Sequence, residues 1–290
     1  MVILWLLGTA GCGLLGWSVL STRRMLYPKA RALTIPHPFP SVNTTQLISR
    51  DGASFDIHLL EARPTRGVIV ACHGYHANWL QLIEIGRGLC QRGYSMITFN
   101  LRGHGTRPGP CTFGIRESGD LDALLTWTQQ QPALARHPVG MLGLSLGGAI
   151  VCQAAARHPT VGAIVLDSTY ARLFPVVAGV IRRTYHFPKI PWAWLTWAGV
   201  QVALHRRLSS VDPQVVATRC RQPLLAIHGT ADHTVPVEHA RKLVASWRGP
   251  TEQWLEPGAG HVGIYTAHPA DYCHRVADFF DRWLLLSSPC

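Results

Sequence analysis

Acidic residues are scarce in this chain. Its 290 residues include 16 Asp and Glu against 27 Lys and Arg, and the resulting formal net charge of +11 is carried almost wholly by arginine. Such a surplus suits anionic lipid, an anionic substrate or nucleic acid. No basic run interleaved with aromatic residues occurs, and no nucleic-acid-binding signature, so we expect no nucleic-acid partner. Apolar residues make up 47% of the chain and charged residues 15%, which excludes a disordered protein.

Motifs for metal binding and redox chemistry are also missing. The eight cysteines contain no C-x-x-C pair, and the 15 histidines contain no H-E-x-x-H motif. Neither a zinc site nor a redox pair is therefore indicated, and nothing in the cysteine usage requires an oxidising compartment.

The beginning of the chain contains no charge at all. Val2 to Leu20 lack any charged residue, and as a helix they would reach about 28 Å, close to the hydrocarbon thickness of a bilayer. A cleaved secretory signal would start with a positive residue and have a shorter apolar core. We therefore predict a transmembrane anchor over residues 1–22, and a helix packed on the protein itself is the alternative.

Basic residues and prolines follow this segment. The basic residues are Arg23, Arg24, Lys29 and Arg31, and none precedes the apolar run. By the positive-inside rule they predict a membrane protein whose catalytic part lies on the cytoplasmic side. Residues 23–43 also contain four prolines and are expected to form an extended linker. Residues 44–290 are long enough for one large domain.

Short apolar segments alternate with helical ones through most of that domain. Strands are expected at residues 44–49, 54–61, 67–72, 94–99, 138–142, 161–167, 223–228 and 252–255, and helices at 80–92, 117–130, 149–157, 236–247 and 269–286. The first two strands, joined across Asp51-Gly52, predict a hairpin. The alternation predicts an α/β fold with a mostly parallel central sheet covered by helices on both faces.

One glycine-rich turn lies between an expected strand and an expected helix. Gly143-Leu144-Ser145-Leu146-Gly147 matches G-x-S-x-G, and this context is typical of a nucleophile elbow. The elbow holds its serine in a strained conformation, and a side chain at either glycine would collide with a neighbouring strand or helix. The helix after it directs its N-terminal N–H groups at any oxyanion formed there. An incidental serine in a glycine-rich loop is the alternative.

Two further residues can complete a catalytic set. Asp232 follows the strand at 223–228, and His261 follows the strand at 252–255. Loops at the carboxyl ends of parallel strands converge on one crevice, and the order Ser, Asp, His suits an α/β-hydrolase. A serine hydroxyl is too weak an acid to attack unaided, so an imidazole must take its proton and a carboxylate must hold that imidazole.

The sequence resembles the serine hydrolases of the α/β-hydrolase superfamily, close to the membrane-attached lysophospholipase and serine-aminopeptidase-like groups. The resemblance covers residues 44–286, and the acid usual before Arg-Gly is Asn100 here, at a position that is normally structural. Its blocks are His73-Gly74, Arg102-Gly103-His104-Gly105, Gly143 to Gly147, and His228 to Asp232 with Val235-Pro236, closed by Gly260-His261.

This resemblance implies a role for each residue of the site. Ser145 is the nucleophile, His261 the base and Asp232 the acid. The N–H groups of Tyr75 and Leu146 form the oxyanion hole. No cofactor or metal is required, because these side chains and amides supply nucleophile, base and electrophile.

Other residues compete for these roles. Asp167 also ends a strand and is the rival for the acid. His73 is expected to orient the loop of residues 73–76, which carries Tyr75 and is called the oxyanion loop below. His104 is expected to stabilise its own turn, so neither histidine is expected to be the base. His233, beside Asp232, is expected to be a loop residue.

An insertion of about fifty residues separates Asp167 from the next strand, and we expect a helical cap over about residues 171–220. Ala171 to Ser210 contain six basic residues and no acid. Ile190 to Leu204 carry no charge and three tryptophans, so this segment is expected to cover the active site, to lie in a membrane interface, or both.

The composition of the cap favours one substrate class. An aminopeptidase should offer an acid for the ammonium group of its substrate, and the cap offers none. An apolar, arginine-bearing cap instead suits an acyl chain near an anionic head group. We therefore predict a carboxylic ester hydrolase for a lipid-like acyl substrate, with membrane lipid as a partner. The alternatives are a peptidase or a thioesterase on the same fold, and a non-catalytic binding module.

Overall fold

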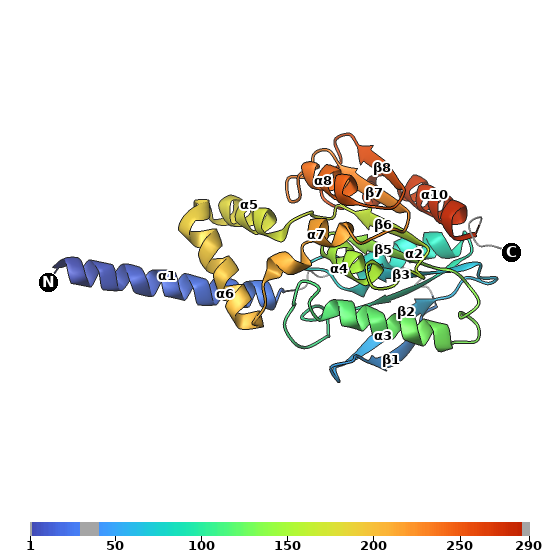
Figure 1. Ribbon diagram of the computed structural model, residues 1–290, viewed down its shortest axis with the longest axis horizontal. Coiled ribbons are helices and arrows are strands. Elements are labelled where there is room, and N and C mark those ends of the chain that lie inside the picture. Colours follow the sequence, from blue (N-terminus) through green and yellow to red (C-terminus); the bar gives the residue numbers. More distant parts are fainter. Residues whose placement is uncertain (1, 30–40, 286–290) are drawn as a thin grey trace.

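A central sheet with helices on both faces forms the body of the molecule, and a helical lobe projects from one end (Figure 1). The computed structural model describes residues 2–29 and 41–285, and for residues 2–11 the backbone alone. The lobe is made of the N-terminal helix α1 (Val2–Leu26) and two helices of the cap, α5 (Leu173–Tyr185) and α6 (Trp194–Leu204).

The sheet has eight strands in the order β1-β2-β4-β3-β5-β6-β7-β8. β1 and β2 form the predicted hairpin, β2 is antiparallel to β4, and every other neighbouring pair is parallel. The predicted α/β-hydrolase fold, with its mostly parallel sheet, is therefore confirmed. The strands are β1 Asn43–Ile48, β2 Ser54–Leu60, β3 Gly67–Cys72, β4 Tyr94–Phe99, β5 Val139–Leu144, β6 Ala163–Asp167, β7 Leu224–Gly229 and β8 Thr251–Glu256.

Helices cover the two faces of this sheet and build two apolar cores. On one face lie α3, α4, α7 and α8, and on the other lie α2 and α10. Alternate residues of β3 enter the two cores, with Val68 and Val70 in one and Ile69 and Ala71 in the other. Strands buried on both faces read as continuous apolar runs, which is why the sequence predicts them well. The helices are α2 Ile83–Cys90, α3 Glu117–Gln130, α4 Leu146–Ala155, α7 Pro213–Ala217, α8 Glu238–Ser246, α9 Ile264–Ala267 and α10 Pro269–Phe280.

The N-terminal helix packs against the cap in the lobe. The Trp17 indole N–H donates to the Trp192 carbonyl at 3.1 Å and to the Thr196 hydroxyl at 3.2 Å. A Cβ added to Gly199 would lie 2.2 Å from Oγ1 of Thr22, so a glycine is needed where α6 crosses α1. The sequence alternative, a helix packed on the protein itself, describes this second half of α1.

The transmembrane helix predicted from the sequence is not found in the described part of the chain. The backbone is helical there, but no helix among the described residues is long and apolar enough to cross a membrane. α1 also continues to Leu26, past residue 22, the expected end of the anchor. Residues 30–40 of the expected linker lie outside the described residues.

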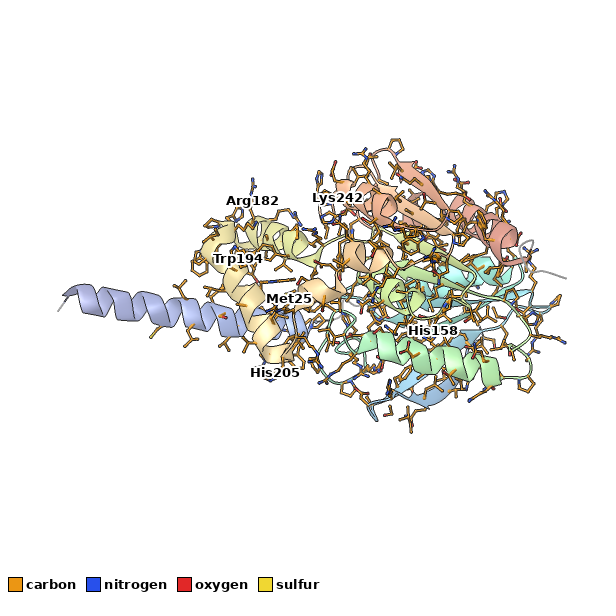
Figure 2. All side chains as sticks on the ribbon, viewed as in Figure 1. Met25, His158, Arg182, Trp194, His205 and Lys242 are labelled. Carbon is orange, nitrogen blue, oxygen red and sulfur yellow. The ribbon has the colours of Figure 1, made fainter. Side chains whose placement is uncertain are left out.

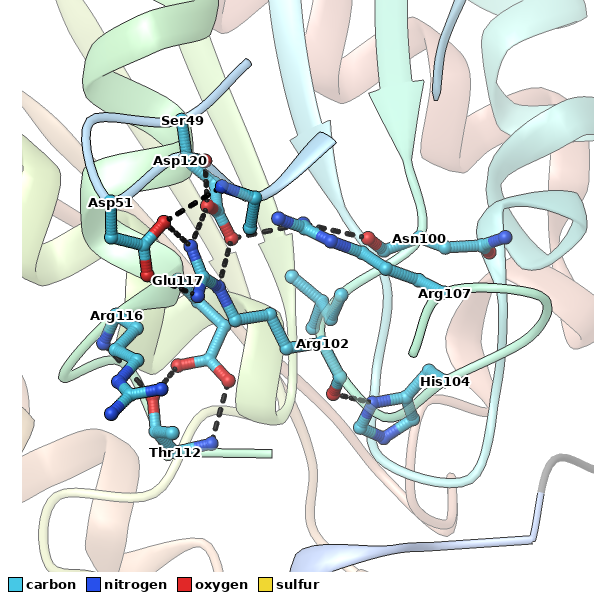
Figure 3. A network of polar contacts seen from close by, with 12 residues as sticks. Ser49, Asp51, Asn100, Arg102, His104, Arg107, Thr112, Arg116, Glu117 and Asp120 are labelled. Carbon is cyan, nitrogen blue, oxygen red and sulfur yellow. Dashed lines mark hydrogen bonds and ion pairs between the residues drawn. The ribbon is translucent and has the colours of Figure 1, made fainter. Parts of the chain in front are cut away.

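A buried charge network ties the β1–β2 hairpin to the body of the fold (Figure 3). The Arg102 guanidinium donates to both carboxylate oxygens of Asp51, at 2.6 and 2.9 Å, and to both of Asp120, at 3.0 and 2.6 Å. Arg107 lies 2.9 Å from Asp120, whose side chain is fully buried. Hydrogen bonding from Arg102 lowers the pKa of Asp51 to about 2. Arg102 belongs to the Arg-Gly-His-Gly block, so this block has a structural role.

Replacing Arg102 with methionine is expected to lower the free energy of unfolding by about 3 kcal/mol, because Asp120 stays buried with one of its two cationic partners gone. The matched control is Arg63→Met, since Arg63 pairs with Glu61 at 2.6 Å but its side chain is 84% exposed; we expect under about 0.5 kcal/mol there. Denaturant unfolding measures both, and equal losses in both variants would contradict the prediction.

The ion pair between Arg102 and Asp51 also makes the stability depend on pH. It stabilises the fold fully above the pKa of Asp51 in the unfolded chain, which is about 3.9, and this stabilisation is lost as the pH falls toward 2.

Candidate active site

Ser145 lies at a sharp turn between β5 and α4. Its φ is 52° and its ψ is −112°, a region that side chains other than glycine rarely adopt. A Cβ added to Gly147 would lie 2.2 Å from the Cys72 carbonyl oxygen, and one added to Gly143 would lie 2.4 Å from the Gly148 Cα. The collisions predicted for these two glycines are confirmed, and the turn has the geometry of a nucleophile elbow.

A chain of two hydrogen bonds joins the predicted catalytic residues. The Ser145 hydroxyl lies 3.0 Å from Nε2 of His261, and Nδ1 of His261 lies 2.6 Å from Oδ2 of Asp232. With its Nδ1 proton directed at the carboxylate, the imidazole presents Nε2 as an acceptor to the hydroxyl. The Ser145 residue is 9% exposed and the His261 side chain 25%, so a substrate can reach the pair from one side.

Asp232 is held as an anion by several donors. Its Oδ1 accepts the N–H groups of Thr234 and Val235, both at 2.8 Å. Burial would raise the pKa of Asp232, but hydrogen bonds from His228 and His261 outweigh it and hold that pKa below its usual range. An ionised carboxylate at this position stabilises a protonated His261.

His228 is a member of the site that sequence reasoning missed. Its Nε2 donates to the Val235 carbonyl at 2.7 Å and lies 3.4 Å from the Asp232 carboxylate. Burial alone would lower the pKa of His228, yet the hydrogen bonds to Asp232 and Val235 raise it. A histidine four positions before the acid opens the His-Gly-Thr-Ala-Asp block, but nothing in that spacing alone marks it as a partner of the acid.

Asp167, the alternative candidate for the catalytic acid, forms no hydrogen bond with His261, whose carboxylate partner is Asp232. Its carboxylate accepts the Ser168 hydroxyl at 2.9 Å and the Tyr272 hydroxyl at 3.1 Å, and burial raises its pKa. The Ser168 oxygen in turn accepts the N–H of Val262 at 3.0 Å. Asp167 therefore supports the backbone next to His261, a role that the sequence did not predict.

His73 and His104 are structural, as expected. His73 donates from Nδ1 to the Gly74 carbonyl at 2.8 Å and accepts the Leu101 N–H on Nε2 at 3.0 Å, so it joins the ends of β3 and β4. His104 donates from Nδ1 to the Arg102 carbonyl within its own turn at 2.9 Å. Burial lowers the pKa of His73 to about 3 and that of His104 to about 4, so both side chains are neutral at pH 7. Neither of them forms a hydrogen bond with Ser145, whose partner is His261.

The two predicted oxyanion donors lie on either side of Ser145. Leu146 is the first residue of α4, and Tyr75 follows β3 in a loop fixed by a hydrogen bond of 2.8 Å from the Gly74 N–H to Gln81. A Cβ added to Gly74 would lie 3.6 Å from the Ser145 Cβ, so this loop lies against the elbow. Within the described ranges neither amide donates to another group of the protein. Their role as oxyanion donors stays a prediction.

A pocket of about 500 Å³ lies between α5 and the loop after β7. Arg182 and Arg183 line it from the cap, and neither forms an ion pair with a described residue. Asp232, His233 and Glu238 line the opposite side. His233 is thus a loop residue at the pocket wall, as expected. Among the described residues no group of three or more His, Cys, Asp or Glu side chains is placed to hold a metal ion.

Comparison with known proteins agrees with the fold described above. The chain is 24% identical over 249 residues to protein YqkD of Bacillus subtilis (strain 168), covering 84% of this chain and 81% of that one. Its fold is similar to that of the Pyrococcus furiosus esterase Pf2001, with a TM-score of 0.71, 20% identity and coverage of 89% and 98%. It is also similar to the Pyrococcus horikoshii acylaminoacyl peptidase, with a TM-score of 0.64, 17% identity and coverage of 84% and 42%.

A family model described as serine aminopeptidase, S33, matches residues 63–216, which is just over half of the chain. These residues include the elbow and the loop of Tyr75. The sequence, the sheet order and the family model therefore agree, and the chain belongs to the serine aminopeptidase S33 family of α/β-hydrolase-fold serine hydrolases.

Proposed function

We propose that this protein is a serine esterase that cleaves the carboxylic ester of a lipid-like acyl substrate through an acyl-enzyme intermediate. The observation that carries the proposal is the hydrogen-bonded chain from Asp232 through His261 to Ser145, with distances of 2.6 and 3.0 Å. A serine in this setting is an activated nucleophile, and acyl transfer is the reaction class that such an arrangement serves.

The reaction proceeds in two halves. The Ser145 oxygen attacks the ester carbonyl carbon while His261 takes the hydroxyl proton, and Asp232 stabilises the imidazolium that forms. The N–H groups of Tyr75 and Leu146 bind the resulting oxyanion. The intermediate collapses, and the alcohol leaves with the proton from His261. A water molecule then attacks the acyl-enzyme with His261 again as base, which releases the carboxylic acid and restores the serine.

The charges around the pocket that adjoins Asp232, which neither Ser145 nor His261 lines, favour an acyl substrate over a free aminoacyl one. An aminopeptidase needs an unpaired carboxylate for the substrate ammonium group. Asp232 is engaged on both oxygens, and Glu238 lies 3.4 Å from Arg241. Arg182 and Arg183 lie opposite without an ion-pair partner among the described residues, so an anionic acyl compound meets a favourable field there.

A panel of acyl compounds with one acyl chain tests the reaction type. We expect the purified full-length protein to turn over the oxygen ester and the thioester, because the site chemistry is common to both, and to turn over an aminoacyl amide far more slowly. Turnover of the amide alone would replace the esterase by a peptidase. A protein that neither turns over any of them nor reacts with a serine-directed phosphonate would be a binding module.

A second part of the proposal is that the enzyme works at an anionic membrane surface. The exposed side chains of the lobe support it. Exposed apolar side chains gather on its three helices and their connections: Leu15, Val19, Leu20, Val180, Ile190, Trp194 and Val202. Figure 2 shows Trp194 and Arg182 on the projecting lobe, away from His158 on the body. Residues 171–210 carry six basic residues and no acid, and apolar side chains rimmed by cations are typical of surfaces that bind anionic lipid.

Vesicle co-sedimentation of the full-length protein tests this part. We expect binding to phosphatidylcholine vesicles that contain phosphatidylglycerol and much weaker binding to phosphatidylcholine alone. The pair Arg206→Glu and Arg207→Glu should weaken binding, because each basic residue near such a surface contributes about 1 kcal/mol. The pair Arg136→Glu and Arg248→Glu is the matched control, since both arginines are exposed on the body. Equal binding by the lobe variant and the control would contradict lobe docking.

A further inference from the structure

We infer that the last turn of the N-terminal helix positions the oxyanion loop, and that the Tyr75 hydroxyl is the group through which it acts. The inference rests on the proposed acyl-transfer function, in which the Tyr75 N–H binds the oxyanion. It assigns a role in the chemistry to a segment that the sequence predicts to be an anchor followed by a linker.

The end of α1 is bonded directly to this loop. The Tyr75 hydroxyl donates to the carbonyl oxygen of Met25 at 2.9 Å and to that of Arg24 at 3.2 Å. The next residue, His76, donates from Nδ1 to the Lys29 carbonyl at 2.9 Å. The last carbonyls of a helix have no partner within it and carry partial negative charge. Donors from the oxyanion loop therefore satisfy acceptors that the helix end leaves open.

The same helix end is held to the body by a separate hydrogen bond. The Cys111 N–H donates to the Leu26 carbonyl at 2.7 Å, and Leu26 is 6% exposed within the core under the sheet. A Cβ added to Gly103 would lie 3.1 Å from that carbonyl. The end of α1 is therefore a fixed point against which the loop can be held.

The loop itself needs such support. His76 has a φ of 63°, a conformation that is strained for a residue other than glycine and persists where the surroundings enforce it. On one side of Tyr75, His73 and Gln81 hold Gly74. On the other side, Tyr75 contacts the end of α1 and His76 contacts Lys29, three residues beyond that end. The amide that faces the oxyanion lies between these two supports.

The Tyr75 ring has its own packing, which lets the hydroxyl be tested separately. The ring stacks on Phe113 with centroids 6.1 Å apart and meets the His104 ring edge-on at 5.5 Å. Tyr75→Phe keeps this ring and removes only the two hydrogen bonds to α1. Because oxyanion stabilisation depends on donor position, a shifted amide weakens the transition state more than the bound substrate.

The test compares Tyr75→Phe with Tyr185→Phe in the full-length protein. Tyr185 is the matched control because its hydroxyl also bonds to α1, accepting from Arg24 Nη1 at 3.0 Å, but it lies on α5. We expect Tyr75→Phe to lower kcat by about 10- to 100-fold with little change in KM. Affinity for a tetrahedral transition-state analogue should fall by the same factor, with an unchanged Tm. Tyr185→Phe should leave kcat at the wild-type value.

A second variant removes the other hydrogen bond that this loop forms with the N-terminal segment, the one from His76 to the Lys29 carbonyl. His76→Gly keeps a residue that tolerates positive φ and removes the Nδ1 donor to the Lys29 carbonyl, and it should lower kcat in the same direction. Wild-type kcat in both variants, or a loss of kcat that tracks a loss of Tm, would overturn the inference. A wild-type protein without turnover or phosphonate labelling would instead refute the proposed function, so the two failures are distinguishable.

Discussion

Ser145→Ala is expected to lower kcat by about 10⁴- to 10⁶-fold while the protein stays folded. The variant removes the only oxygen that lies within hydrogen-bonding distance of Nε2 of His261 among the described residues, at 3.0 Å. The alanine keeps the Cβ of the elbow, so the φ of 52° is no more strained than before. Steady-state kinetics on the acyl ester measure the loss, and thermal unfolding checks the fold.

A serine-directed phosphonate provides the second measurement for this variant. The wild-type protein should be labelled and Ser145→Ala should not. Ser210→Ala is the control, because Ser210 lies in the cap and its hydroxyl donates to the Arg207 carbonyl at 2.6 Å; it should be labelled like the wild type. Equal labelling of Ser145→Ala would place the nucleophile elsewhere.

Asp232→Asn is expected to lower kcat by about 10⁴-fold. The reason is electrostatic and geometric, because an amide neither stabilises the imidazolium nor fixes the tautomer in which Nε2 faces Ser145. His228 also loses its charged partner, although the two backbone N–H groups of Thr234 and Val235 can still bond to the amide oxygen. The protein should therefore fold, and thermal unfolding would verify it.

The matched comparison is Asp167→Asn. Asp167 ends a neighbouring strand and is equally buried, but its hydrogen bonds go to Ser168 and Tyr272. We expect a loss of kcat of less than about 10-fold, since its effect reaches the base only through Ser168 and the Val262 amide. If Asp167→Asn lost more activity than Asp232→Asn, the acid would be assigned to the wrong strand.

These experiments separate the chemistry of the site from its support. The charge network of Arg102 and the hydrogen bonds of His73 fix the loops at the carboxyl ends of β3 and β4, and their loss should appear as loss of stability. The Asp232–His261–Ser145 chain should affect kcat without affecting Tm. Tyr75 has both kinds of contact: its ring packs in the body, and its hydroxyl bonds to α1, so that removing the hydroxyl alone should lower kcat without changing Tm.

The strands of this protein could be predicted from its sequence because each carries a local signal. β3 and β6 are buried on both faces, and each reads as an apolar run, which ends in β6 at Asp167. Helix starts were less well predicted. α4 begins at Leu146, directly after the nucleophile, although the expected helix starts at Ala149, because the glycines at 147 and 148 hide its first turn. α6 begins at Trp194 rather than at Ile190, whose backbone is not helical.

The candidate site was predictable for a similar reason. Ser145, Asp232 and His261 stand at the ends of strands, and a parallel sheet brings the ends of its strands to one edge. His228 and Ser168 were missed because their function is to hold other residues. A histidine four positions before an acid, or a serine after Asp167, has no distinctive pattern until its partners are known.

The sequence by itself determined the α/β fold, the elbow and the three residues that meet there, because these depend on apolar periodicity and on the order of the loops. Only the tertiary structure decided where the first helix lies and what it contacts. Trp17 and Trp192 are 175 positions apart, and Met25 and Tyr75 are 50 apart. Hydrogen bonds over such separations leave no periodic signal in the chain, so an apolar segment reads as an anchor although its last turn bonds to the oxyanion loop.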